Sequence, residues 1–330
     1  MTTPASPDIA APAPSRRLWW VLGWCVLAVF FAIAAFALPW KDVMSALAAA
    51  KWQWVALAVV VIVAGWPLWI LQWWLLAPSA HRPTFARMAQ VTALTGTANT
   101  SLPIAGVVAA VGFLIARGRL PASAAASLYA VDQLLTGFAK LGVLVLAAWL
   151  VPVPDWLRAG LLTLAGVMAL FTLAMLAAAH GGELIHRLAA RLTGRPAQFV
   201  HHFADFVAHL EPMRSPLLGF STTMLAFAKK AVEVLSVLII QVAVGIEPSI
   251  ASAVLVTAAL SLATMAPISP GHLGVYEATV IFCYQFMGVP LPLATAAAFL
   301  QHGAGFVASF AGIGYLSWAL PRDERGARTL

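Results

Sequence analysis

The chain has 330 residues, of which 62% are hydrophobic and 9% are charged, and its mean hydropathy is +0.90. This composition excludes an ordinary soluble domain and indicates an integral membrane protein. Its unbroken apolar runs favour helices over a barrel of alternating strands. The net charge of +7 is small for a nucleic-acid binder, so no nucleic-acid partner is expected.

Two apolar runs follow an N-terminal stretch that is rich in Ala, Pro and Ser. Residues 1–17 are predicted to be a disordered, cytoplasmic N-terminus. The run 18–38 is about twice as long as the apolar region of a signal peptide, so it is interpreted as a first transmembrane span. Residues 41–51 are predicted to form a short polar loop before a second span at 55–77.

A polar segment interrupts the next apolar run. Residues 95–106, TGTANTSLPIAG, place Asn99, a proline and Gly106 at membrane depth. Hydrocarbon offers the backbone no hydrogen-bond partner, so a broken helix survives there only where protein or a watery cavity surrounds it. The pattern predicts a re-entrant helical hairpin near 86–116, and a long span at 122–150 follows it.

The second half begins with a span at 160–179, after a loop that includes residues 152–158. The polar region 180–214 has apolar residues at helical spacing, which predicts a cytoplasmic amphipathic helix on the membrane surface. Its histidines lack the cysteines or carboxylates that usually complete a metal shell, so no metal site is predicted. Further spans are predicted at 217–244 and 292–320. Residues 321–330 then form a cytoplasmic tail.

The segment 265–277, MAPISPGHLGVYE, lies in an apolar run between those last two spans. Its two prolines lack an N–H, and Gly271 and Gly274 permit tight turns. A second re-entrant hairpin is therefore predicted near 250–288. The N-terminus of its second helix would offer free N–H groups to an anion such as a phosphate. A proline-kinked structural helix is the alternative interpretation.

The basic residues test this topology. If both hairpins leave the membrane on the side from which they enter, six full spans remain and both termini share one side. Of the 19 Lys and Arg residues, 13 then lie on the side of the termini, three lie opposite and three lie inside spans. The 13 are Arg16, Arg17, Arg82, Arg87, Arg117, Arg119, Arg187, Arg191, Arg195, Arg214, Arg322, Arg325 and Arg328. Because basic residues favour the cytoplasmic side, both termini are expected in the cytoplasm, with the chain in a bacterial inner membrane.

The same arrangement gives two membrane repeats, 18–158 and 159–320, each with three full spans and one hairpin. Three crossings invert the second repeat relative to the first, and residues 120–138 resemble residues 291–306. Inverted repeats whose broken helices meet near the midplane are typical of transporters. The predicted fold is an all-α integral membrane protein with six transmembrane helices and two re-entrant helical hairpins, arranged as an inverted repeat.

Charged residues inside the spans are candidate site residues, because a charge in hydrocarbon is costly and usually faces the bundle interior. Lys229 and Glu233 are four residues apart and are predicted to pair. This pairing leaves Lys230 either to contact a phosphate headgroup or to extend to the membrane surface. Asp132 and Lys140 are eight residues apart on one face, where they form an ion pair or line a pathway.

Three titratable residues lie in or after the second break. Glu277 either compensates the helix dipole or serves as a proton or substrate site. His272 and His302 have either a packing role or a pathway role. The sequence contains no nucleophile elbow, zinc-protease motif or nucleotide-binding loop, so no enzyme activity, catalytic residue or cofactor is expected.

The decapeptide SPGHLGVYEA, residues 269–278, resembles a known signature. It is similar to the Pro-Gly-Gly-Leu-Gly-Val-Phe-Glu-Ala motif of the flippase-like transmembrane domain of lysylphosphatidylglycerol synthases. Glu233, Asp132 and the spacing of Asn99 and Gly106 support the resemblance, which extends over nearly the whole chain. No aminoacyltransferase domain is expected, because the sequence contains no polar region large enough for one. The resemblance therefore implies lipid translocation and not aminoacylation.

Three departures from the family pattern involve lost charges. Gly106 is followed by Val107, where the family continues with Glu-x-x-Arg. Gln133 stands where an arginine commonly follows the acidic residue. The arginine typical of the last span is replaced by Gln301 or His302. These losses imply a different or less charged lipid headgroup.

The sequence thus predicts a lipid flippase for a phospholipid, a polyprenyl-phosphate-linked lipid or a hopanoid-type lipid. One alternative is a secondary transporter of a small polar or anionic solute, with a closed polar cavity in place of a lateral opening. Another is a non-transporting accessory subunit of a membrane lipid or glycan biosynthetic enzyme. The expected partners are a membrane lipid and either a second copy of the chain or such an enzyme. The candidate substrate-binding residues are Glu277, His272, Gly271, Gly274, Glu233, Lys230, Lys229, Asp132, Asn99 and His302.

Overall fold

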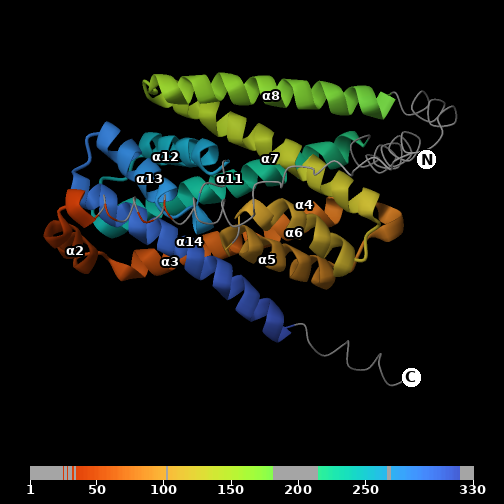
Figure 1. Cartoon of the computed structure of the whole chain (residues 1–330), viewed down its shortest axis with the longest axis horizontal. Coiled ribbons are helices and arrows are strands. Elements are labelled where there is room, and N and C mark those ends of the chain that lie inside the picture. The colour runs from red at the N-terminus through yellow and green to blue at the C-terminus, as the bar shows by residue number, and fades with distance from the viewer. Residues whose placement is uncertain are drawn as a thin grey trace, which may run out of the picture.

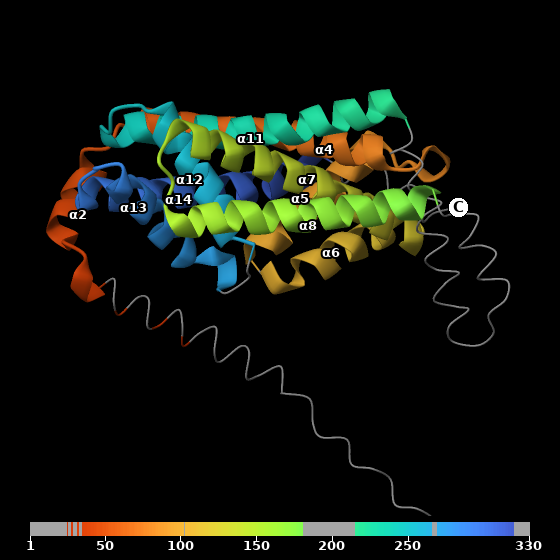
Figure 2. The same ribbon diagram turned by 90° about the horizontal axis from the view of Figure 1, so that it is seen from above.

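The computed structural model describes residues 35–101, 103–180, 215–265 and 269–319, together with Cys25, Ala28 and Ala32. These residues are all-helical and contain no strand. Most helices run along the long axis of one bundle (Figures 1 and 2). The elements are α2 (Trp40–Ala48), α3 (Trp52–Ala64), α4 (Trp66–Leu76), η1 (Ser79–His81), α5 (Phe85–Ser101), α6 (Pro103–Ala116), α7 (Ala122–Leu150), α8 (Asp155–His180), α11 (Pro216–Val244), α12 (Ile250–Ala263), η3 (Pro270–His272), α13 (Val275–Phe286) and α14 (Leu291–Ala319).

Four described segments are long and apolar enough to cross a membrane, which makes the chain a multi-pass membrane protein. They are Trp52–Leu76, Ala122–Leu150, Asp155–Leu173 and Leu291–Phe310, and they coincide with four of the predicted spans. The helix α11 is as long as α7 and about as apolar, but its three charged side chains set it apart from these four segments.

Some predictions concern residues outside the described ranges. These are the N-terminus 1–17, most of the first span 18–38, nearly all of the amphipathic segment 180–214, and the tail 321–330. Within the described residues two predicted loops are too long, because α2 covers 41–48 of the loop 41–51 and α8 begins at Asp155 within the loop 152–158. In α2 an apolar face outweighs the two exposed charges. Val43 is fully buried, and Trp40 stacks on Phe299 of α14 with ring centroids 6.1 Å apart.

The helices α5 and α6 form a helical hairpin within the range predicted for the first one. Pro103 begins α6, where its missing N–H is not needed by the helix. Gly106 is buried, and a Cβ atom at this position would collide with Oδ1 of Asn99. Glycine at 106 therefore permits the close approach of the two helices.

The helices α12 and α13 form a second hairpin, and the helical break predicted at 265–277 is present. Gly271, His272 and Gly274 all have left-handed backbone conformations, with φ of 60°, 56° and 86°. Glycine adopts this conformation freely, whereas a histidine is strained in it. The hydroxyl of Ser269 donates a 2.7 Å hydrogen bond to the carbonyl of Leu273, which closes the turn on itself.

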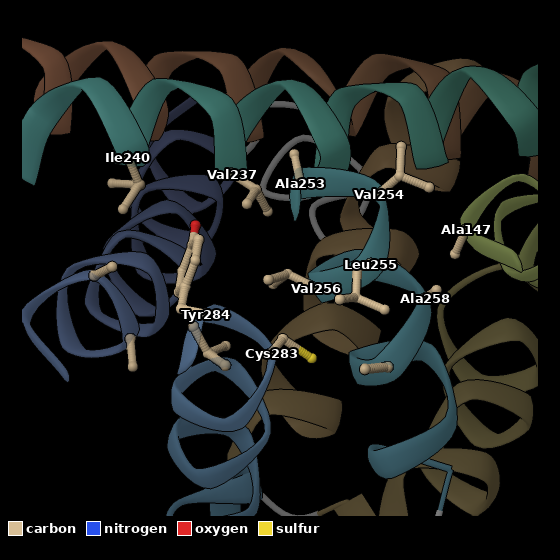
Figure 3. Packing of buried hydrophobic residues seen from close by; sticks show 14 of the residues in the cluster. Ala147, Val237, Ile240, Ala253, Val254, Leu255, Val256, Ala258, Cys283 and Tyr284 are labelled. Atoms are coloured by element: carbon tan, nitrogen blue, oxygen red, sulfur yellow. The ribbon is translucent and has the colours of Figure 1, made fainter. Parts of the chain in front are cut away.

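The two hairpins meet inside the bundle. Both α5 and α6 contact η3, and α14 packs against α13, α11, α5 and α3. An apolar core holds α11, α12 and α13 together, in which Val237, Val256 and Tyr284 face one another (Figure 3). Because protein surrounds the break, its irregular backbone meets the condition for surviving at membrane depth.

Candidate functional site

The break in the second hairpin is tied to α14 by a short hydrogen bond between two buried side chains. Oε1 of Glu277 lies 2.6 Å from Nδ1 of His302, and the two residues are 5% and 9% exposed. Oε2 of Glu277 accepts a 2.7 Å hydrogen bond from the N–H of Gly274. The carboxylate thus caps its own helix and holds the histidine ring at once.

Aromatic rings enclose His302. Its imidazole stacks on Tyr276 with centroids 4.1 Å apart, and Phe306 lies on it at 4.6 Å. The neighbouring Gln301 is buried beside Tyr276, and its Oε1 atom has no hydrogen-bond partner among the described residues. The ring is therefore held in one orientation in a tightly packed setting.

The prediction of free N–H groups at the start of α13 is wrong for Gly274. The Glu277 carboxylate occupies that donor, so an external anion would have to displace it. Gly271 and Gly274 are both buried at the turn. Nδ1 of His272 is buried and lacks a hydrogen-bond partner among the residues that the structure describes, while the side chain lies within electrostatic range of His302 and Lys140.

The ion pair predicted between Lys229 and Glu233 is also wrong. Nζ of Lys230, and not that of Lys229, lies 2.5 Å from Oε2 of Glu233. Lys229 points across to α7, where its Nζ atom lies 3.6 Å from Oδ1 of Asp132 and 5.9 Å from the centre of the Trp69 ring. Residues three apart on a helix are neighbours as much as residues four apart, so packing against α7 decides the pairing.

Lys140 does not form the ion pair with Asp132 that was one of the two roles predicted for these residues. It lies on α7 within electrostatic range of Lys230 and Glu233 of α11. Glu233 in turn is within electrostatic range of Tyr276 on α13. Because Tyr276 stacks on His302, the pair Glu277–His302 lies next to a residue that is within electrostatic range of a charged side chain of α11.

Asn99 contributes to the architecture of the site. Its side chain fills the space beside Gly106 within the first hairpin, and that hairpin contacts η3. The structure brings the remaining candidates into two groups. One group contains Glu277, His302, His272, Gly271, Gly274, Lys230 and Glu233, and the other contains Asp132 and Lys229.

An apolar groove lies beside the break, between α8 and the end of α12. It has a volume of about 360 Å³ and is lined by Trp156, Gly160, Thr163, Leu164, Val167, Leu262, Ala263 and Met265. Gly160 brings the two helices close together, because a Cβ atom there would collide with Cδ1 of Leu262. The helix α8 packs mainly on α7 at the edge of the bundle, so the groove lies near the outside of the bundle (Figures 1 and 2).

The family model described as Lysylphosphatidylglycerol synthase TM region matches residues 20–312. The chain belongs to this family. No curated protein and no solved structure matches it. Membership in the lysylphosphatidylglycerol synthase TM-region family confirms the resemblance seen in residues 269–278, and it implies a membrane domain related to lipid and flippase-like function.

The sequence did not identify two side chains that surround the Glu277–His302 pair. Tyr276 covers the His302 ring, and Gln301 is buried beside Tyr276. Tyr276 directly precedes Glu277 in the signature, so its position in the motif was the available signal. Gln301 was noticed only as a departure from the family's arginine, because its contact with α13 depends on how α14 packs.

Proposed function

We propose that this chain moves a lipid between the two leaflets of the inner membrane, with a phospholipid, a polyprenyl-phosphate-linked lipid or a hopanoid-type lipid as its substrate. The observation that carries this proposal is the position of the apolar groove beside the polar break. Leu262, Ala263 and Met265 line the groove, and the break that follows them leads to Glu277. A lipid has the same division between an apolar chain and a polar headgroup.

In the proposed membrane arrangement, six full spans and two re-entrant hairpins form an inverted repeat with both termini in the cytoplasm. The lengths of the hairpin helices support it. The helices α5, α6, α12 and α13 contain 17, 14, 14 and 12 residues. At 1.5 Å per residue they are about 18–26 Å long, whereas the hydrocarbon core is about 30 Å thick. Each is too short to cross alone, and the two hairpins meet at η3.

The charges around the break favour a headgroup of low net charge. Lys140, Lys229 and Lys230 are balanced by Asp132, Glu233 and Glu277, and two of the three lysines form ion pairs. A site in which lysines already have carboxylate partners attracts a zwitterionic or weakly anionic group more than a multiply charged one. The headgroup would pass between α7, α11 and the break. Its movement between the leaflets would break no covalent bond.

The groove would hold one hydrocarbon chain of the lipid. Its volume of about 360 Å³ is at the lower end of small-molecule sites, which measure roughly 300–1,000 Å³. Val167 lines the groove and is half exposed, so Val167→Trp fills the space without disturbing the core. Val145 on α7 is equally exposed and lies outside the groove, so Val145→Trp is a matched control.

The principal test is a leaflet-exchange assay in proteoliposomes with fluorescent phospholipid and polyprenyl-phosphate probes. Wild type and Glu247→Gln should accelerate exchange of at least one probe, since Glu247 is exposed in the α11–α12 loop. Glu277→Gln should abolish the acceleration, and Val167→Trp should slow it where Val145→Trp does not. Folded wild type that exchanges none of the probes would overturn the proposal, and stable association with a lipid or glycan biosynthetic enzyme would then support the accessory role.

A further inference from the structure

The pair Glu277–His302 is built like a proton-binding site. A histidine is the side chain whose charge changes most readily between pH 5 and 8, and this one is buried at membrane depth against a carboxylate. We propose that the pair binds and releases one proton in each cycle, so that lipid movement is coupled to a proton gradient. The transport part of this inference rests on the proposed function, whereas the proton site itself does not.

The proton positions follow if Glu277 is ionised. Oε2 of the carboxylate accepts the N–H of Gly274, and Nδ1 of His302 then has to carry the hydrogen of the 2.6 Å bond to Oε1, because an ionised carboxylate only accepts. The exchangeable proton therefore binds at Nε2. Its arrival changes the net charge of the pair from −1 to zero, because an imidazolium then faces the carboxylate. Tyr276 and Phe306 cover the ring faces and limit solvation of either state.

A change of charge here acts directly on the break. The same carboxylate holds the backbone N–H of Gly274, and the turn at Gly271 and Gly274 is where the second hairpin meets the first. An unbalanced charge in a low-dielectric interior is costly, so the two protonation states favour different packing around the carboxylate. Proton binding can thereby bias a conformational equilibrium of the hairpin.

Titratable residues of neighbouring elements lie within electrostatic range of one another between the exposed Glu233 and this pair. Glu233 of α11 is half exposed and bonded to Lys230, and it lies within electrostatic range of Lys140 and Tyr276. Lys140 is within range of His272, which is within range of His302.

The other elements packed on α13 and α14 contribute little charge. The described residues of α12 and α3 contain no ionisable side chain. Arg87 of α5 lies in its first turn, Lys41 and Asp42 of α2 are exposed, and Tyr284 of α13 faces Gln241. In the proposed mechanism protons therefore enter at Glu233, the exposed carboxylate among these residues.

The transport test uses proteoliposomes with an imposed pH gradient and the probe that wild type exchanges. If one proton accompanies each lipid, a one-unit gradient should shift the steady-state leaflet ratio by about tenfold, and reversing the gradient should reverse the shift. His302→Gln should leave exchange without any dependence on the gradient. The matched variant His81→Gln, at an exposed histidine of η1, should behave as wild type. Wild type that exchanges lipid with an unchanged leaflet ratio, or His302→Gln that still responds, would overturn the coupling.

A second measurement separates the proton site from lipid transport. In ¹⁵N-histidine NMR of the full chain in nanodiscs, the His302 signals are those missing from His302→Gln. They should change with pH while Nδ1 keeps its hydrogen, and this change should differ between wild type and Glu277→Gln, since the buried carboxylate is the ring's charge partner. A His302 that keeps one protonation state from pH 5 to 9 would overturn the inference even where lipid exchange is found. A titrating, Glu277-dependent His302 would support it even where no probe is exchanged.

Discussion

Among the described residues, two largely buried acid–base pairs connect neighbouring helices, and they differ in kind. Asp132 and Lys229 join α7 to α11 at 3.6 Å, with side chains 5% and 19% exposed. Glu277 and His302 join α13 to α14 at 2.6 Å, with side chains 7% and 11% exposed. The first pair has a basic partner that stays charged, whereas the second has one that can become neutral near physiological pH. The first is suited to holding helices together, and the second to changing state.

The largest effect is expected where a fixed charge loses its partner. Asp132→Asn should lower the free energy of unfolding by about 3 kcal/mol, because Lys229 is left largely buried without a counter-charge. Unfolding in mixed micelles measures the loss. The double variant Asp132→Asn with Lys229→Gln should recover most of it. A double variant that is less stable than either single variant would show that the unpaired charge of Lys229 does not cause the loss of stability.

Glu277→Gln should cost less stability than Asp132→Asn, although it should abolish lipid exchange. A neutral His302 is tolerated without its carboxylate, and the glutamine oxygen can still accept the N–H of Gly274. The loss should be about 1–2 kcal/mol, for one weakened cap and one weakened hydrogen bond. The same unfolding assay checks it. An equal or larger loss than in Asp132→Asn would mean that the second pair is structural too.

The breaks in the two hairpins could be predicted from sequence because their causes are local. A proline removes a backbone donor wherever it stands, and Gly271 and Gly274 supply the left-handed conformations that the turn uses. The signature around Glu277 likewise identified the family. What these features share is that neighbours in the chain determine them.

The partners within the site could not be predicted, because they depend on how whole helices rotate against one another. Lys229 and Lys230 are adjacent, about 100° apart on α11, and only packing against α7 decides which one reaches Asp132. The bond between Glu277 and His302 joins residues 25 positions apart. Each could be recognised as a candidate by itself, and the sequence contained no signal that pairs them.

The stacking of Tyr276 on His302 offers a smaller test of the second pair. Tyr276→Leu keeps an apolar side chain on α13 but removes the ring 4.1 Å from the imidazole. The loss of stability should be about 1 kcal/mol, the usual value of such an aromatic contact beyond its buried area. In the histidine NMR experiment the His302 signals should broaden as the ring loses its fixed orientation. Signals as sharp as in wild type would show that Phe306 and Glu277 alone hold the ring.

The smallest effect on stability is expected at the third acid–base pair, Lys230 with Glu233. Its carboxylate is 52% exposed, so solvent and salt screen the interaction even though the two atoms lie 2.5 Å apart. Glu233→Gln should therefore cost about 0.5 kcal/mol or less in the unfolding assay. It should nevertheless slow the response of lipid exchange to a pH gradient, because it removes the exposed end of the route to His302. Glu247→Gln, an equally simple change at another exposed glutamate, should leave both the stability and the gradient response unchanged.

If Glu233→Gln costs as much stability as Asp132→Asn, the exposure of a pair does not tell whether its role is structural or functional. If it leaves the gradient response at the wild-type rate, protons reach Glu277 and His302 by another path.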